Sequence, residues 1–127
     1  MATRPTFLSG DVFTAVNANI LATSIVALNT QSGTAYTAAL TDVGKLISFT
    51  SGSAIAFTIP ANATVAFAVG DQINIYQAGT ANATITPAAT VTVRSSGSKL
   101  KTNDQFSVAT CIKIDTNEWI ALGNLKA

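Results

Sequence analysis

Short runs of alternating hydrophobic and polar residues, separated by turn residues, fill the chain from about residue 24 onward. In the run 54–59, for example, Ile55, Phe57 and Ile59 share one face and Pro60 follows directly. Alternation with a period of two is typical of a half-buried strand, and proline ends a strand because it has no N–H to donate. Further strands are predicted at 45–50, 65–69, 72–77, 83–86 and 91–94.

The clearest strand pair lies near the C-terminus. One face of 106–115 carries Phe106, Val108, Thr110, Ile112 and Ile114, and the other carries Ser107, Ala109, Cys111, Lys113 and Asp115. The turn 115–118 then returns the chain into a partner strand at 119–122. Its first residue, Trp119, is predicted to pack in the core of this hairpin, with ligand stacking as the alternative.

About seven to ten short strands at this spacing predict an all-β fold, a compact sandwich or jelly-roll-like domain. Similar Thr-Ile-Pro and Thr-Ile-Thr-Pro sequences at 58–60 and 84–87 leave a β-helical arrangement as a less favoured alternative. We expect two parts, an N-terminal arm with a short helix at 1–23 and a β domain at 24–127.

The arm contains the one segment that does not look like strand or turn, SGDVFTAVNANIL at 9–21. Val12, Val16 and Ile20 lie four residues apart and form one stripe of a short helix, with Thr14 as its N-cap. So short a helix is marginal alone, so we expect it to pack on another surface. The docking residues predicted for contact with a neighbouring subunit or a capsid are Phe7, Leu8, Val12, Phe13, Val16 and Ile20.

A metal site in the same segment is the competing hypothesis. Asp11, Asn17 and Asn19 offer oxygen ligands, but they lack the spacing of a calcium-binding loop. We therefore interpret the segment as a docking arm and predict no metal ion there.

The composition indicates which classes of partner the chain binds. Charged residues make up 10% of the chain, against about 25% in an average protein, and the net charge is +1. So few charges suggest that much of the surface contacts other protein, and the near-neutral chain attracts neither nucleic acid nor an anionic membrane. No run is long enough for a membrane helix, and Arg4-Pro5 is followed by no apolar segment of a signal peptide.

Few residues of the chain are candidates for catalysis. The chain has no histidine, which excludes Ser-His-Asp and Cys-His nucleophiles and most zinc sites. Cys111 is interpreted as a half-buried strand residue, and Asp115 and Glu118 as turn residues rather than paired catalytic acids. We expect a protein that is not an enzyme, with no catalytic residue, no metal and no cofactor.

Four residues remain as candidate surface contacts. Tyr76 lies on the face opposite Ile73 and Ile75, so it points to solvent or to a subunit. Arg94, Lys99 and Lys101 lie in the Ser/Gly-rich stretch 94–101, interpreted as a solvated loop because it lacks the aromatic residues of a nucleic-acid site.

Several stretches resemble structural proteins of tailed bacteriophages, tail-fibre-like and virion-surface proteins. These stretches are 29–45 (NTQSGTAYTAALTDVGK), 58–74 (TIPANATVAFAVGDQIN) and 112–123 (IKIDTNEWIALG). The segment beginning at Phe7 is similar to an F-x-x-G-D/E-V-L-T-A-x-x-(M/V)-N element of such proteins, with Phe13 in place of leucine. The resemblance covers about residues 7–20 and 29–123.

The resemblance implies an all-β module that forms a homotrimer and has no enzymatic activity. Because the chain is short, we expect a capsid decoration (cement) protein of the virion, bound to the major capsid protein or another virion protein and stabilising the head. The alternative is a tail or head fibre module that binds a receptor or glycan on the host cell surface. Without a signal peptide, the protein would be made in the host cytoplasm.

Overall fold

The described part of the chain, residues 27–127 of the computed structural model, consists of strands and two short 3-10 helices. The strands are β1 (Leu28–Gln31), β2 (Ala35–Thr37), β3 (Leu46–Phe49), β4 (Ile55–Ile59), β5 (Gln72–Gln77), β6 (Ala83–Pro87), β7 (Thr92–Ser95), β8 (Lys101–Thr102), β9 (Val108–Asp115), β10 (Glu118–Gly123) and β11 (Leu125–Lys126). The helices are η1 (Leu40–Asp42) and η2 (Ser96–Ser98). The predicted all-β class is confirmed; the predicted N-terminal helix lies outside the described residues.

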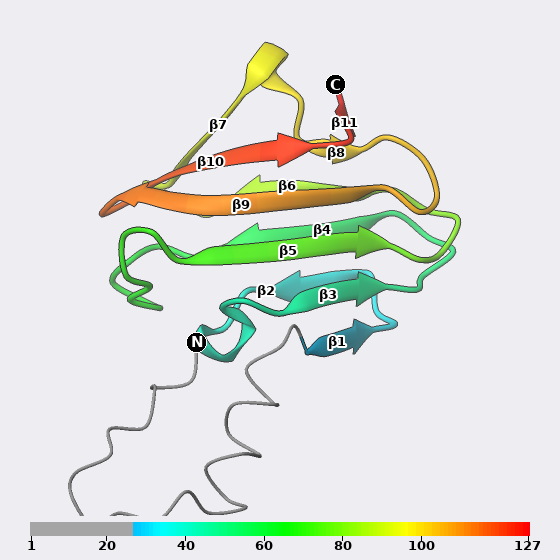
Figure 1. The fold of residues 1–127 in the computed structure, drawn as a ribbon, viewed down its shortest axis with the longest axis horizontal. Coiled ribbons are helices and arrows are strands. Elements are labelled where there is room, and N and C mark those ends of the chain that lie inside the picture. Colours follow the sequence, from blue (N-terminus) through cyan, green and yellow to red (C-terminus); the bar gives the residue numbers. More distant parts are fainter. Residues whose placement is uncertain (1–26) are drawn as a thin grey trace, which may run out of the picture.

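The strands form two mixed sheets (Figure 1). Sheet A has the order β1-β3-β5-β9-β10-β7, and sheet B has the order β11-β8-β6-β4-β2. From β1 to β8 the chain alternates between the sheets, so that odd-numbered strands join sheet A and even-numbered strands join sheet B. Residues far apart in sequence therefore become neighbours within each sheet.

The first six strands stack as coils. In sheet A, β1, β3 and β5 pair in parallel, and in sheet B, β2, β4 and β6 do the same. Thr58 pairs with Thr86 and Ile59 with Pro87, so the two similar sequences noted at 58–60 and 84–87 lie on adjacent strands. This path is that of a β-helix, the less favoured alternative, whereas a jelly roll is built from antiparallel strands.

The predicted C-terminal hairpin is present and completes sheet A. Antiparallel strands β9 and β10 lie between β5 and β7, and Asp115 pairs with Glu118 at the turn. The next pair is Trp119 with Lys113, so Ile114 has no partner and the register shifts at this point. A bulge of this kind adds a residue to one strand and reverses which side chains face inward beyond it.

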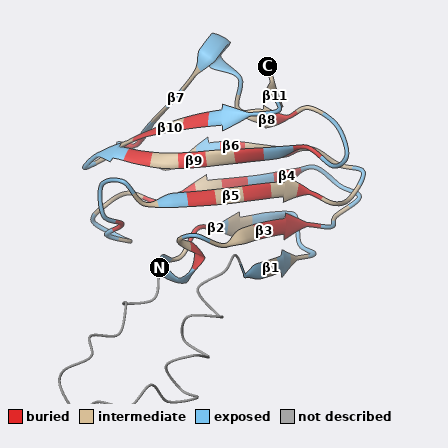
Figure 2. Ribbon diagram, in the orientation of Figure 1, coloured by how far each residue is buried: buried red, intermediate tan, exposed pale blue. Residues whose placement is uncertain are grey.

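The core lies between the two sheets, where buried positions face one another (Figure 2). Alternate residues of β4 and β5 supply Ile55, Phe57, Ile59, Ile73 and Ile75, all at most 2% exposed. Trp119 is 1% exposed, which confirms its predicted core position. None of the helices in residues 27–127 is long and apolar enough to cross a membrane.

Other strand predictions need correction. The region 65–69 is not a strand: it belongs to the connection between β4 and β5, where Phe67 is buried but Val69 is 65% exposed. The short strands β1, β2, β8 and β11 were not predicted, and the described part of the chain holds eleven strands in all. Strands of two to four residues are too short to show a periodic pattern.

Candidate interaction surface

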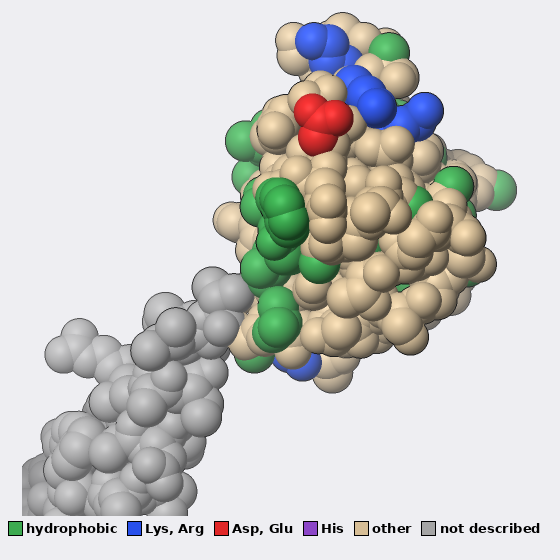
Figure 3. Space-filling model, turned by 90° about the vertical axis from the view of Figure 1, so that its right-hand side faces the viewer, with side chains coloured by type: hydrophobic (Ala, Val, Ile, Leu, Met, Phe, Trp, Pro, Cys, Tyr) green, Lys and Arg blue, Asp and Glu red, His purple; other side chains and the backbone are tan. Residues whose placement is uncertain are grey.

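The outer face of sheet A is neutral and largely apolar. The inter-strand register aligns its residues in rows, one of which is Thr30, Ser48, Tyr76 and Val108. Other apolar members of this face are Leu28, Leu46, Ile112, Ile120 and Leu122. Leu28 is 63% exposed, Val108 45% and Leu122 49%. Figure 3 shows hydrophobic side chains along the left of that view, the side onto which sheet A faces.

The larger apolar residues of β9, Val108, Ile112 and Ile114, face outward rather than into the core. Ala109, Cys111 and Lys113 are buried, while the alternate residues Val108 and Ile114 are exposed. On β10, Trp119 and Ala121 are buried and Leu122 is exposed. The two sets of residues seen in the sequence thus lie on opposite faces, and the larger apolar set is the one that remains outside.

Polar side chains on this face bond to one another. Thr110 Oγ1 donates to Asn74 Oδ1 at 2.8 Å, and Gln72 Nε2 donates to the same oxygen at 3.0 Å. Asn74 Nδ2 donates to the carbonyl oxygen of Lys45 at 3.3 Å. A partner that covered these three side chains would therefore not leave the Asn74 amide unpaired.

Tyr76, the candidate contact on sheet A, is half-buried beside Val108 and Ser48 on neighbouring strands. An aromatic ring used for sugar stacking needs an open face. The position of Tyr76 within a row of side chains makes it part of a continuous surface rather than a separate stacking platform.

The candidate cations lie at the edge strands. Arg94 Nε and Glu118 Oε2 form an ion pair at 3.0 Å, and the hydrogen bond and charge of Glu118 raise the pKa of Arg94. Lys101 pairs across strands with Lys126 on edge strand β11. Lysines on an edge discourage pairing with another sheet. The stretch 94–101 is thus only partly the predicted loop, since Arg94 lies in β7 and Lys101 in β8.

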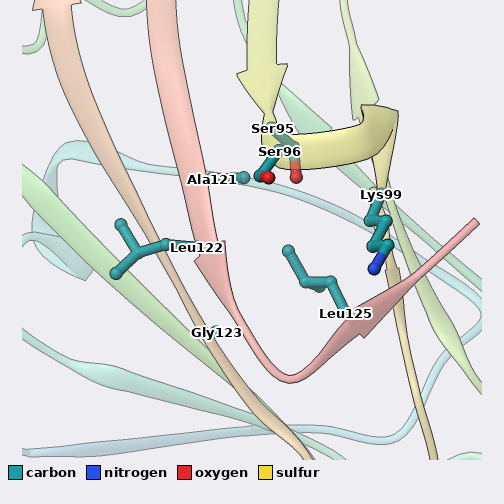
Figure 4. A pocket seen from close by; sticks show the side chains of 7 residues that line it. All are labelled: Ser95, Ser96, Lys99, Ala121, Leu122, Gly123 and Leu125. Atoms are coloured by element: carbon teal, nitrogen blue, oxygen red, sulfur yellow. The ribbon is translucent and has the colours of Figure 1, made fainter.

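A shallow hollow of about 210 Å³ lies near these lysines (Figure 4). Its walls are formed by Ser95, Ser96, Lys99, Ala121, Leu122, Gly123 and Leu125. Figure 4 shows the Leu122 side chain directed away from Lys99 and Leu125. Pockets for small molecules usually start at about 300 Å³, so this hollow suits at most a small group of atoms.

The residues weighed for catalysis have structural roles. Cys111 is fully buried, not half-buried as predicted, and burial raises the pKa of its thiol to about 12, which suppresses the reactive thiolate. Asp115 Oδ1 accepts a hydrogen bond from the Thr116 N–H at 2.7 Å, and Glu118 binds Arg94. These contacts match the predicted turn chemistry.

Lys113 is a buried residue whose burial the sequence pattern did not indicate. Its side chain is 2% exposed, and Nζ donates to Asn62 Oδ1 at 2.6 Å and to the Phe67 carbonyl oxygen at 2.7 Å. Both acceptors lie in the connection between β4 and β5. Lys113 therefore holds that connection against sheet A; its alternation with Ile112 and Ile114 was visible, but not which set is inward.

A second buried charge, Asp42, was also missed. It is 1% exposed and accepts hydrogen bonds from Asn29, from the Tyr36 hydroxyl at 2.7 Å and from the Ala39 N–H. Burial, followed by the hydrogen bond to Asp42, raises the pKa of Tyr36. Asn29 belongs to β1 and Tyr36 to β2, so Asp42 joins the edge strands of both sheets.

The predicted docking residues Phe7, Leu8, Val12, Phe13, Val16 and Ile20 lie outside the described residues. Within residues 27–127, no group of three or more metal-binding side chains lies together. The feature of this region best suited to bind something is thus a surface, the outer face of sheet A. We found no protein family, curated protein or solved structure that matches the chain.

Proposed function

We propose that the protein is a non-enzymatic structural protein of a tailed-bacteriophage virion, a trimeric capsid decoration protein that stabilises the head. The neutral, largely apolar outer face of sheet A carries this proposal from the structure, because such a surface serves protein contact. The sequence resemblance to virion proteins supplies the kind of particle. The resembling stretches contribute β1, β2 and η1, then the end of β4 and the start of β5, and then most of the β9–β10 hairpin.

In this proposal the β domain acts as a rigid body between contacts. Strands β3 to β6 and the hairpin share one buried cluster, so force applied to one sheet is transmitted to the other. The N-terminal residues Phe7, Leu8, Val12, Phe13, Val16 and Ile20 dock on a neighbouring subunit or on the major capsid protein. Stabilisation of the head then follows from contacts that are lost when capsomers separate.

Immunogold labelling of virions tests the location. Antibodies raised against the purified chain should label the heads of a phage that encodes it, and densitometry of purified particles should give hundreds of copies per virion. Label confined to the tail, with a few copies per particle, would reject the capsid role.

Deletion of residues 1–22 tests the arm. We expect the truncated protein to keep its far-ultraviolet circular dichroism spectrum, since the described strands begin at Leu28. It should bind virions that lack the protein more weakly than the full chain does. Equal decoration by the full and truncated chains would show that the arm does not attach the protein.

The alternative is a tail or head fibre module that binds a host receptor or glycan. The observation that favours it is the group of lysines near the C-terminal end, Lys99, Lys101 and Lys126, around the hollow beside Leu125. Figure 3 shows Lys and Arg side chains gathered at the top of the molecule. Purified protein would then block adsorption of the phage to host cells; no competition at micromolar concentration would reject this alternative.

A further inference from the structure

We propose that copies of this chain associate through the outer face of sheet A. This deepens the proposed function and rests on it for the number of copies, because it names the surface that the trimer buries. Three features of the structure support a second copy as the occupant of this face: its contrast with sheet B, its charge, and its internal hydrogen bonds.

The two outer faces of the molecule differ in chemistry. Sheet B presents rows of small and polar residues, in which Thr37, Thr58 and Thr86 are aligned across three strands. A second row on this face is Ala35, Ala56, Thr84, Lys101 and Lys126. Hydroxyl groups and lysines suit contact with water, while the leucine, isoleucine and valine side chains of sheet A do not. Sheet A is therefore the face that gains most from being covered.

The size of the apolar surface supports the same conclusion. Leu28, Val108 and Leu122 are about half exposed or more, and with their neighbours they present an apolar area on the order of a few hundred Å². Such an area lies in the range of the largest patches on monomeric proteins, which often serve binding. Association would remove this apolar surface from water, which lowers the free energy.

The charge of the face fits a second copy of the chain better than a charged partner such as an anionic membrane or a nucleic acid. Across β1, β3, β5, β9 and β10 its outward residues are neutral except at the hairpin turn, where Asp115 pairs across strands with Glu118 and Arg94 binds Glu118 at 3.0 Å. Two identical neutral faces approach without repulsion, whereas a membrane surface or a nucleic acid would need unpaired cations here. The lysines lie on sheet B instead, where Lys101 and Lys126 are cross-strand neighbours.

The polar cluster around Asn74 on this face keeps its hydrogen bonds on burial. Gln72 and Thr110 both donate to Asn74 Oδ1, and Asn74 donates to a backbone carbonyl, so these groups keep their partners when water is removed. An unpaired amide in their place would cost about 1–3 kcal/mol. Apolar side chains of another copy can thus cover Asn74 without leaving its amide unpaired.

The outer face of sheet A is smaller than a standard protein–protein interface, so an interface built on it needs flanking surfaces as well. Four inter-strand spacings of about 4.8 Å and six residues of about 3.3 Å give a face of roughly 19 by 20 Å. A standard interface buries about 800 Å² on each partner, so the face would form the centre and flanking surfaces the rim. Three such faces turned towards one axis enclose a shared apolar centre in a trimer.

Light scattering coupled to size-exclusion chromatography of the full chain tests this inference. The wild type should elute at three times the 13.0 kDa mass of one chain. A double variant of sheet A, Val108→Lys with Leu122→Lys, should elute at the mass of one chain, because two cations per copy would be buried at the contact. The matched control on sheet B, Ala56→Lys with Thr86→Lys, should keep the wild-type mass.

A second double variant, Val108→Thr with Leu122→Thr, tests the same face with less risk of unfolding the chain, because threonine favours strands. It should raise the concentration at which half of the protein is dissociated by at least tenfold. The inference is overturned if the lysine and threonine pairs of sheet A both keep the wild-type mass and midpoint, or if the wild type is monomeric at every concentration. A monomer that still labels virion heads would overturn this inference and the trimeric state, and would leave the capsid decoration role standing.

Discussion

The indole of Trp119 meets the ring of Phe67 edge-on, with ring centroids 5.3 Å apart and planes at 84°. Trp119 lies on β10 of sheet A, and Phe67 lies in the connection between β4 and β5. Both side chains are at most 4% exposed. The contact fixes that connection over one end of the core, and edge-to-face pairs add about 0.5–1.5 kcal/mol to the burial of their area.

Replacement of Trp119 by alanine should lower the free energy of unfolding by about 3–5 kcal/mol, because it removes the largest fully buried side chain. Val69→Ala, at a 65% exposed side chain in the same connection as Phe67, is the control and should cost about 0.5 kcal/mol or less. Urea denaturation followed by circular dichroism measures both. Equal losses in the two variants would mean that Trp119 does not anchor the core.

The all-β class and most of the longer strands could be predicted from the sequence because buried and exposed positions alternate in β4, β5, β9 and β10. Which side chains of the β9–β10 hairpin face the core could not be predicted. In a regular two-residue hairpin Trp119 would lie opposite Ile114, and the isoleucines of β9 would share its inward side. The bulge pairs Trp119 with Lys113 instead, and thus turns Ile112 outward.

The connectivity was equally hard to predict. Thr58 and Thr86 are 28 positions apart, and only their similar surroundings indicated that they pair. The surface was predicted in one member, Tyr76, because its outward position follows from the alternation around Ile73 and Ile75. Its extent depends on register between β1, β3, β5, β9 and β10, which the alternation within a single strand does not determine.

Lys113 should stabilise the connection between β4 and β5 through its two hydrogen bonds. Lys113→Met keeps the length of the side chain but leaves Asn62 Oδ1 and the Phe67 carbonyl oxygen without this donor. We expect a loss of about 2–6 kcal/mol in the free energy of unfolding, from two unpaired acceptors at about 1–3 kcal/mol each.

Lys99→Met, at an exposed lysine, is the matched control for Lys113→Met and should change stability by less than about 0.5 kcal/mol. Hydrogen exchange provides a local measurement. The amide of Gly70, which donates to the Lys113 carbonyl oxygen at 2.7 Å, should exchange faster in Lys113→Met. Unchanged exchange there together with unchanged stability would contradict the anchoring role.

Cys111 should make the protein less stable in alkali. Burial raises the pKa of its thiol from 9.0 to about 12, so above pH 9 the unfolded chain loses this proton while the folded chain keeps it. The unfolded state then binds fewer protons, and stability falls by about 1.4 kcal/mol per pH unit between about pH 9 and 12. Below pH 9 this contribution is constant.

Cys111→Ala removes the contribution of the thiol, so its free energy of unfolding should fall less steeply than that of the wild type from pH 9 to 11. Urea denaturation at intervals of half a pH unit gives both slopes. Tyr36, whose pKa is also raised, is present in both proteins and cancels in the difference. Parallel curves for the two proteins would show that Cys111 is accessible to solvent.

Asp42 should hold the two sheets together at the end formed by β1 and β2. Asp42→Ala removes the acceptor of Asn29, of the Tyr36 hydroxyl and of the Ala39 N–H, and we expect a loss of at least about 3 kcal/mol, from three unpaired donors at about 1–3 kcal/mol each. Asp104→Ala, at an exposed carboxylate, is the control and should cost less than about 0.5 kcal/mol.

The pKa of Tyr36 in Asp42→Ala should also fall towards its ordinary value, because the hydrogen bond and charge of Asp42 both raise it. Absorbance titration at alkaline pH in a Tyr76→Phe background reports Tyr36 alone, since the chain has two tyrosines. A Tyr36 pKa that did not move, in a variant as stable as the control, would show that Asp42 does not bind the hydroxyl in solution.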